Sequence, residues 1–153
     1  MYHPDCDYLD GEVVERNWGE SSHGRLQGLA CVALMKHEKA CRVQFLLELR
    51  IQVRPGRFRI ADICAISLDA PDEQIPTHPP FLCIEILSIQ DTMRVMMDRI
   101  HDYLAMGVPH VWVIDPESRR GYQYTSDGMR EAKDGILRTT EPAIEVPIAD
   151  LFD

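Results

Sequence analysis

The stretch from Arg59 to Asp115 decides the fold. It contains the segments Arg-Ile-Ala-Asp-Ile-Cys-Ala-Ile (59–66), Phe-Leu-Cys-Ile-Glu-Ile-Leu-Ser (81–88) and Gly-Val-Pro-His-Val-Trp-Val-Ile-Asp-Pro (107–116). The first two segments are mostly apolar, and each carries one carboxylate, Asp62 and Glu85. An ionised carboxylate in apolar surroundings costs several kcal/mol unless a cation or hydrogen-bond donors compensate it. The two acids therefore require a partner, and we expect a metal ion.

An amphipathic helix is predicted between the second and third segments. Asp91 or Thr92 can cap its start, and Gly107 ends it. Its apolar side chains recur at helical spacing at Met93, Met96, Met97, Ile100 and Leu104. A strand, a helix and a second apolar strand form a βαβ unit, so we expect parallel strands and a right-handed crossover.

The pattern upstream predicts a helix followed by a hairpin. Residues 22–38 have helical periodicity. Apolar residues alternate from Cys41 to Val53, which predicts a long, half-exposed strand. Pro55-Gly56 turns the chain, and the strand from Arg57 to Ser67 is expected to pair with it antiparallel.

The remaining segments give weaker signals. Asp10-Gly11 predicts a turn before a short strand, and residues 69–80 predict a surface loop. Short strands are predicted at 121–125, 136–138 and 143–146, with a turn at 127–128 and a helical turn at 148–152. We expect one domain over residues 1–153, of the α/β class, with a mixed central sheet and flanking helices.

Composition limits the partners and the compartment. The net charge of −9 disfavours a nucleic-acid partner, unless clustered cations or a divalent metal ion offset it. No apolar run approaches the roughly 18 residues of a membrane span, and the acidic N-terminus lacks an export signal. Five cysteines, with no Cys-x-x-Cys pair, match neither a zinc site nor a disulfide framework. A cytoplasmic protein without a membrane partner is expected.

The two carboxylates suit a magnesium ion. If the strands that carry them are neighbours, Asp62 and Glu85 can converge at one end of the sheet. Magnesium prefers one or two carboxylates and keeps much of its hydration, so a strand carbonyl and waters would complete the shell. The alternative is that each acid forms a salt bridge with an arginine such as Arg57, Arg59 or Arg99.

These residues resemble a known family. The turn at Pro55-Gly56, the strand ending Glu85-Ile86-Leu87-Ser88, Tyr103 on the helix and the string from Gly107 to Pro116 look like the Uma-type putative restriction endonuclease family. That family belongs to the PD-(D/E)XK nuclease superfamily. Asp10-Gly11-Glu12-Val13-Val14 and His23-Gly24 also match its opening. The resemblance implies a restriction-endonuclease-like fold and an endonuclease that hydrolyses phosphodiester bonds in DNA.

The resemblance also assigns a site. It implies that Asp62, Glu85 and the backbone carbonyl of Ile86 bind Mg²⁺ or Mn²⁺. The superfamily lysine two residues after the glutamate is Leu87 here, and the lysine that the family carries on the next helix is Arg99. A guanidinium can stabilise charge on a phosphate but does not deprotonate water. Arg99 is therefore expected to steady the phosphate in a weakened nuclease.

Glu12 and His23 are lesser candidates for this site. Glu12 is either an additional carboxylate at the metal or a solvated side chain after a turn, and His23 is either a site residue or a structural histidine. Tyr103 and Trp112 are predicted to be core residues. A duplex has two strands to cut and each chain would supply one site, so we expect a homodimer.

A second interpretation is a catalytically inactive binding or assembly module with a nuclease fold. In that case Arg99 forms an ion pair with Glu85 where a metal ion would otherwise bind. The net charge and the absent lysine favour this alternative.

Overall fold

A mixed sheet of eight strands runs through the protein, in the order β2-β1-β4-β5-β6-β7-β8, with β3 paired to β4. The computed structural model describes residues 6–15 and 21–153. The strands of this sheet are β1 (Cys6–Leu9), β2 (Glu12–Glu15), β3 (Val43–Arg54), β4 (Arg57–Ser67), β5 (Leu82–Ile86), β6 (His110–Asp115), β7 (Arg120–Thr125) and β8 (Gly128–Glu131). The other elements are α1 (Ser21–Met35), α2 (Glu38–Cys41), α3 (Met93–Met106), the separate strand pair β9 (Ile136–Arg138) and β10 (Glu145–Pro147), and the 3-10 turn η1 (Ile148–Leu151).

The predicted βαβ unit is confirmed in β5, α3 and β6. Strands β5 and β6 are parallel, with Glu85 opposite Val113. Helix α3 begins after Thr92, whose hydroxyl accepts a hydrogen bond from Val95 N at 3.1 Å. It ends at Gly107, whose φ of 107° is in the left-handed region that favours glycine.

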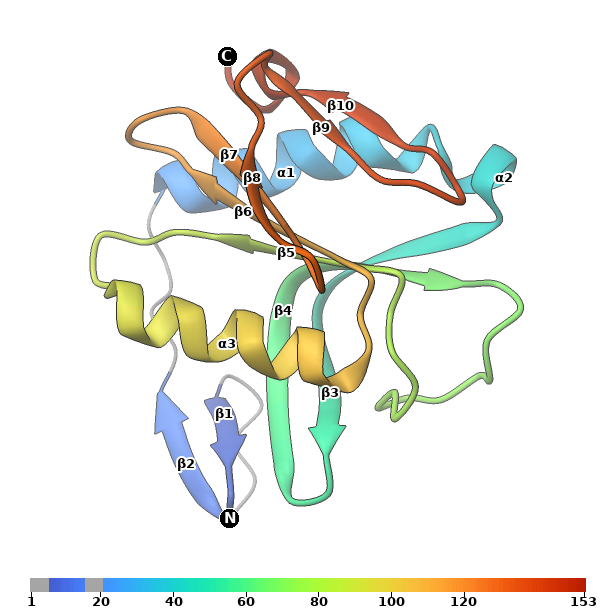
Figure 1. The fold of residues 1–153 in the computed structure, drawn as a ribbon, viewed down its shortest axis with the longest axis vertical. Helices are drawn as coiled ribbons and strands as arrows, with labels where there is room; N and C mark the ends of the chain where they lie inside the picture. Colours follow the sequence, from blue (N-terminus) through green and yellow to red (C-terminus); the bar gives the residue numbers. More distant parts are fainter. Residues whose placement is uncertain (1–5, 16–20) are drawn as a thin grey trace.

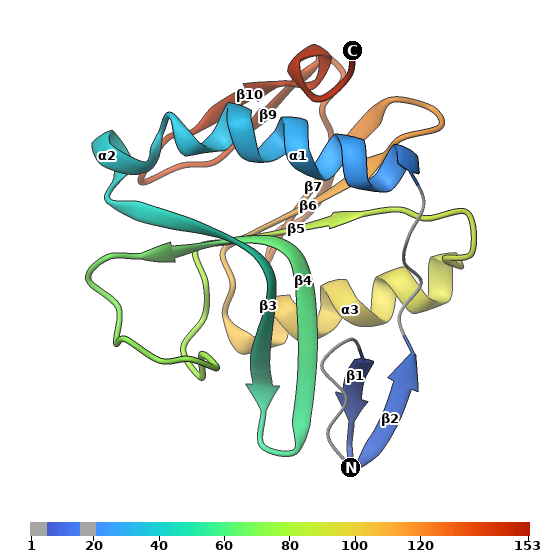
Figure 2. The ribbon, with the colours of Figure 1, turned by 180° about the vertical axis from the view of Figure 1, so that it is seen from behind.

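Two apolar cores cover the two faces of the sheet. Helix α1 and helix α3 lie on opposite sides of β5 and β6 (Figures 1 and 2). The core on the α1 side includes Leu26 and Trp112, whereas the core on the α3 side includes Ile100 and Tyr103. All four side chains are buried, and each large apolar side chain contributes about 1.5–3 kcal/mol. The prediction that Tyr103 and Trp112 are core residues is confirmed.

The predicted antiparallel hairpin of β3 and β4 is also confirmed, but it is irregular at Asp62. Leu47 pairs with Ile63 and Leu49 with Ala61, while the intervening Glu48 has a φ of 52°. In a regular strand Ala61 and Ile63 would face the same side. Here Ala61 packs in the core on the α3 side and Ile63 in the core on the α1 side. The local bend at Asp62 breaks the alternation of β4.

Some predicted elements differ from the structure. The N-terminal segment is a hairpin of β1 and β2, where a single strand was expected. The first helix ends at Met35, and the separate short helix α2 follows it. Strand β8 was not predicted because its side chains are largely exposed, so no apolar alternation marks it.

Two further observations concern the described part of the chain. Cys31, Cys41, Cys64 and Cys83 are free thiols. Within residues 6–15 and 21–153, no helix combines the length and the apolar content that crossing a bilayer would require.

We expect Gly107→Ala to destabilise the fold. A Cβ at this position would meet Pro79 Cγ at 3.3 Å, and the left-handed φ is strained for alanine. Urea unfolding is expected to show a loss of about 1 kcal/mol or more. The control is Gly28→Ala, at an exposed position of α1 with open space around a new Cβ, which should gain about 0.5–1 kcal/mol. Equal effects of the two changes would contradict the assigned role of Gly107.

Candidate metal centre

Asp62 and Glu85 lie side by side at the junction of β4 and β5. Asp62 Oδ2 accepts a hydrogen bond from Ile86 N at 2.8 Å, and Glu85 Oε2 accepts one from Asp62 N at 3.1 Å. These bonds continue the pairing beyond Ile63 and Ile84, where the regular antiparallel register stops. The Asp62 and Glu85 residues are 3% and 0% exposed. The structure therefore brings together the two acids that the sequence singled out, in a buried position.

Helix α1 supports Asp62 from one side. The Nε2 atom of His23 lies 3.4 Å from Asp62 Oδ2. One turn further along, Gln27 Nε2 donates hydrogen bonds to the Asp62 carbonyl oxygen at 2.9 Å and to Glu48 Oε1 at 3.0 Å. Residues four apart share a helix face, so His23 and Gln27 hold Asp62 from the same direction. The structure thus brings the candidate His23 to the site, together with Gln27 and Glu48.

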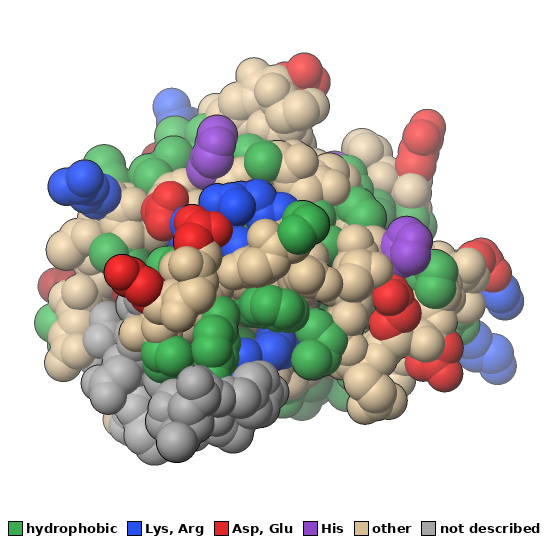
Figure 3. Space-filling model, turned by 90° about the horizontal axis from the view of Figure 1, so that it is seen from below, with side chains coloured by type: hydrophobic (Ala, Val, Ile, Leu, Met, Phe, Trp, Pro, Cys, Tyr) green, Lys and Arg blue, Asp and Glu red, His purple; other side chains and the backbone are tan. Residues whose placement is uncertain are grey.

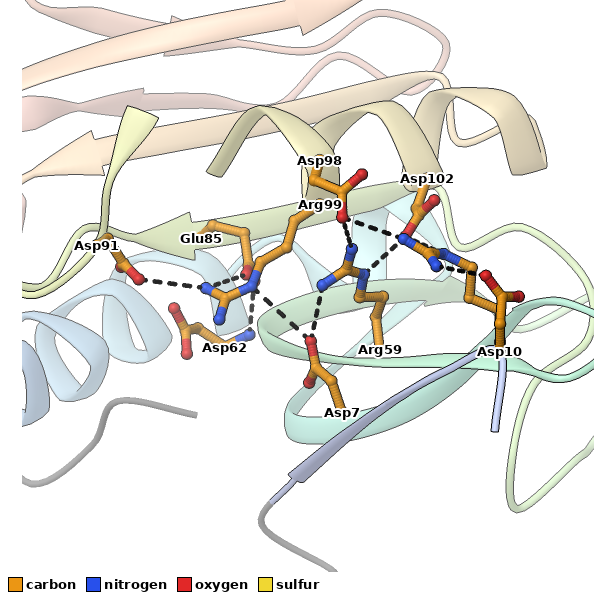
Figure 4. Close-up of polar contacts among 10 residues, drawn as sticks. Asp7, Asp10, Arg59, Asp62, Glu85, Asp91, Asp98, Arg99 and Asp102 are labelled. Carbon is orange, nitrogen blue, oxygen red and sulfur yellow. Dashed lines mark hydrogen bonds and ion pairs between the residues drawn. The ribbon is translucent and has the colours of Figure 1, made fainter. Parts of the chain in front are cut away.

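Helix α3 supplies Arg99 from the other side. Its Nη1 lies 3.6 Å from Glu85 Oε1 and 3.7 Å from Asp91 Oδ1, and its Nε lies 3.8 Å from Asp7 Oδ2 (Figure 4). Burial lowers the pKa of the Arg99 guanidinium, but the charges of Glu85, Asp7 and Asp91 outweigh burial and leave that pKa raised. Arg99 therefore stays cationic.

A second set of ion pairs, the arginine network, continues from Asp7 along the same interface (Figure 4). It consists of Asp7, Asp10, Arg57, Arg59, Asp98 and Asp102. Asp102 Oδ2 accepts hydrogen bonds from Arg57 Nε at 2.8 Å and from Arg59 Nε at 2.7 Å. Of the three arginines considered as partners for the strand acids, only Arg99 forms an ion pair with one of them, Glu85, among the contacts described.

Several carboxylates and guanidiniums meet at this interface. In the part of the chain that the structure describes, the ion pairs involve the carboxylates of Asp7, Asp10, Asp62, Glu85, Asp91, Asp98 and Asp102 and the guanidiniums of Arg54, Arg57, Arg59 and Arg99. Among these guanidiniums, that of Arg99 contacts Glu85 and Asp91. Neighbouring buried carboxylates such as Asp62 and Glu85 are stabilised by a bound cation.

The donor set fits magnesium or manganese better than zinc. Among the described residues, no three His, Cys, Asp or Glu side chains come together as a metal-ligand group. Two carboxylates, a backbone carbonyl and water satisfy magnesium, whereas structural zinc sites use nitrogen and sulfur side chains. Burial and the charge of Glu85 raise the pKa of the Cys64 thiol to about 12, so this thiol stays protonated and is a poor ligand.

Two hydrogen-bond donors near the acids are consistent with ordered water in this region. The Tyr103 hydroxyl and Arg99 Nε are buried without a hydrogen-bond partner among the described residues. Burial, followed by the nearby charge of Glu85, raises the pKa of Tyr103 well above its usual value. The hydroxyl therefore stays protonated and could donate a hydrogen bond to the oxygen of an ordered water molecule.

Glu12 is not brought to the acids. It is exposed at the start of β2, opposite Leu9, and Leu9 pairs with Arg57. Arg57 precedes Asp62 by five residues of β4, about 16 Å along an extended strand. Ile86 is buried in β5 and its N–H binds Asp62. The role of its carbonyl as a ligand stays a prediction.

Sequence reasoning missed Asp7 and Asp91 as site residues. Asp91 was considered only as a helix cap, and Asp7 lies in a short polar segment without any periodic signal. Their side chains are only 2% and 3% exposed, and both contact Arg99. The burial of a charged side chain at either position is explained only when its contact with Arg99 of α3 is known.

The fold is shared with a solved structure. The structure is similar to the crystal structure of a putative nuclease belonging to DUF820 from Anabaena variabilis, with a TM-score of 0.81 and 20% sequence identity. The match covers 97% of this chain and 90% of the other. It confirms the prediction of a restriction-endonuclease-like α/β fold with a mixed sheet.

The chain belongs to the Uma2 family, whose description is "Putative restriction endonuclease", and the match spans residues 3–148. The resemblance found in the sequence motifs is therefore confirmed, over more of the chain than those motifs covered. No curated protein matches the sequence.

Arg59→Met should destabilise the fold strongly. The Arg59 side chain is 3% exposed and donates hydrogen bonds to Asp7, Asp98 and Asp102. Its loss leaves buried carboxylates uncompensated, and we expect a decrease of about 3 kcal/mol in the free energy of unfolding. Urea titration measures the change. Arg25→Met is the control, because it removes an exposed pair with Asp153 and should leave the midpoint unchanged. A similarly small effect of Arg59→Met would show that the arginine network is not stabilising.

Proposed function

We propose that this chain is a metal-dependent endonuclease that hydrolyses phosphodiester bonds in DNA, with residues 1–153 forming a single nuclease-like domain. The observation that carries the proposal is the pair Asp62 and Glu85, buried side by side with one oxygen of each carboxylate held by a backbone N–H group. A divalent cation would stabilise these neighbouring carboxylates and would supply the chemistry of metal-assisted phosphodiester hydrolysis. Membership of the Uma2 family supports the reaction class.

Asp62, Glu85 and the carbonyl of Ile86 would hold Mg²⁺ or Mn²⁺. When bound, the ion lowers the pKa of a coordinated water and neutralises charge on the phosphate. The backbone N–H groups of Ile86 and Asp62 fix one oxygen of each carboxylate. His23 and Gln27 fix the position of Asp62 from α1. The protein therefore holds both ligands in place before any ion binds, which lowers the ordering cost of binding.

Arg99 would stabilise the phosphate. Its guanidinium stays cationic and lies beside Glu85, so it can attract a negatively charged oxygen that approaches the site. A guanidinium does not remove a proton from water, so Arg99 is not a general base. We therefore expect a nuclease that is weaker than one with lysine at this position.

DNA is the proposed substrate despite the net charge of −9. On the face drawn in Figure 3, the basic side chains near the centre are recessed among acidic and hydrophobic ones. Electrostatic attraction of the DNA backbone would then depend on the bound divalent ion as well as on Arg99. We further propose a cytoplasmic homodimer, because a duplex has two strands to cut and each chain supplies one site.

A second candidate function is a catalytically inactive binding or assembly module. The observation that favours it is the ion pair at 3.6 Å between Arg99 and Glu85. In this alternative the guanidinium replaces the metal ion as the partner of Glu85. The two candidate functions differ in whether a metal ion can replace the Arg99 guanidinium as the partner of Glu85.

Asp62→Asn and Glu85→Gln should each abolish metal-dependent cleavage. The expected loss in rate exceeds the roughly 100-fold effect of removing an outer-shell partner of a metal ligand. Cleavage of plasmid DNA with Mg²⁺ or Mn²⁺ measures activity, and calorimetric titration measures ion affinity. Asp127→Asn, a change at an exposed turn, is the matched control and should leave both unchanged. Equal Mg²⁺ affinity in the wild type and in a variant with both substitutions would refute the assignment.

Arg99→Lys distinguishes the two candidate functions. A lysine at this position restores the amine that the family carries, and its shorter reach also loosens the pairing with Glu85. If the protein is a weakened nuclease, we expect cleavage to increase by about tenfold or more. If neither the wild type nor the Arg99→Lys variant cleaves DNA with Mg²⁺ or with Mn²⁺, the binding module is favoured. The unfolding midpoint of the variant checks that the fold is retained.

A further inference from the structure

Asp91 is a buried carboxylate on the side of Arg99 away from the arginine network. It lies in the loop between β5 and α3, immediately before the cap residue Thr92. Its side chain is 3% exposed. Asp91 Oδ2 accepts a hydrogen bond from Ser88 N at 3.0 Å, while Oδ1 lies 3.7 Å from Arg99 Nη1. The loop therefore holds this carboxylate with one oxygen directed at the guanidinium.

Arg99 Nη1 is shared almost equally between two acids, Glu85 at 3.6 Å and Asp91 at 3.7 Å. Both distances are longer than the 2.7–3.2 Å of a good hydrogen bond. The guanidinium is thus attracted by both acids without being locked onto either of them. A small movement of this long side chain would strengthen one ion pair and weaken the other.

A bound cation changes the balance between these two positions. A divalent ion on Glu85 repels the guanidinium, since both carry positive charge, and this repulsion is strong in a buried site. Arg99 then needs another anion close by, or its charge remains uncompensated. Asp91 provides that anion, and Asp7 assists at Nε.

We propose that Asp91 is a positioning residue that holds the Arg99 guanidinium when Glu85 binds the metal ion. The inference rests on the proposed metal-dependent function. In the absence of metal, Arg99 is shared between Glu85 and Asp91. In its presence, Arg99 pairs with Asp91 and remains next to the ion, in the position where it can meet a phosphate. Asp91 thereby makes the pairing of Arg99 with Glu85 reversible.

Asp91 also lines a hollow of about 570 Å³, together with residues that include Ser22, Ser88, Asp115 and Glu117. Ser22, in this lining, immediately precedes His23, which contacts Asp62. The hollow also contains Asp115, an acid that accepts hydrogen bonds from Glu117 N and Ser118 Oγ. Asp115 therefore offers a matched control for the charge of Asp91.

The test is a cycle of Mn²⁺ titrations without DNA, by calorimetry, on the full chain. The variants are Asp91→Asn, Arg99→Met, the combination of both, and Asp115→Asn. We expect Asp91→Asn to weaken Mn²⁺ binding by about tenfold, within the usual range of coupling between sites, because Arg99 then remains on Glu85. In the Arg99→Met background the same substitution should change the affinity by less than about twofold, because no guanidinium has to be moved. Asp115→Asn should have little effect in either background.

Three outcomes would overturn the inference. If Asp91→Asn weakens Mn²⁺ binding equally with and without Arg99, Asp91 is a metal ligand and not a positioning residue. If Asp91→Asn changes the Mn²⁺ affinity no more than Asp115→Asn does, Asp91 has no specific role in positioning Arg99. If neither the wild type nor Arg99→Met binds Mn²⁺, the proposed metal-dependent function itself fails. Should Asp91→Asn not fold, Asp91→Ser repeats the cycle, because its hydroxyl can still accept the Ser88 N–H.

Discussion

Compensation of buried negative charge is the constraint on which this structure depends. Asp62 and Glu85 lie between two apolar cores, where an unpaired charge is strongly destabilising. Backbone N–H groups stabilise part of that charge, and Arg99 stabilises part of the remainder. The arginine network extends the same alternation of charges from the site to strand β1. Packing of α3 against the sheet therefore requires arginines and acids in matching positions.

Much of the fold could be predicted because its signals are local. The alternation of β3, the turn at Pro55-Gly56 and the helical spacing between Thr92 and Gly107 each lie within one element. Strand β8 gave no signal, because a largely exposed strand has no apolar face. The bend of β4 at Asp62 could not be predicted either, since it lies opposite the left-handed φ of Glu48 on β3, where the regular pairing is interrupted, and the composition of β4 does not signal it.

The candidate site could be predicted only in part. Asp62 and Glu85 were found because a charge stands out in an apolar strand. His23 was noticed through the family resemblance, and its contact with Asp62 supports that choice. Asp7 and Asp91 come from polar segments, and their burial depends on where Arg99 of α3 meets them. These contacts join residues that are far apart in the sequence or lie in different elements. They depend on how the elements pack together, and no local sequence pattern predicts that packing.

The place of Asp7 has a consequence for the amino-terminal hairpin. Strand β1 pairs with β4 at only two positions, Tyr8 with Phe58 and Leu9 with Arg57. Its firmer attachment is Asp7, which contacts both Arg59 and Arg99. Because thermodynamic coupling is reciprocal, a change in the charge around Arg99 alters how tightly the first strand is anchored, and loosening that strand alters the centre in return. The attachment of β1 to the sheet is therefore expected to depend on the charges that surround Arg99.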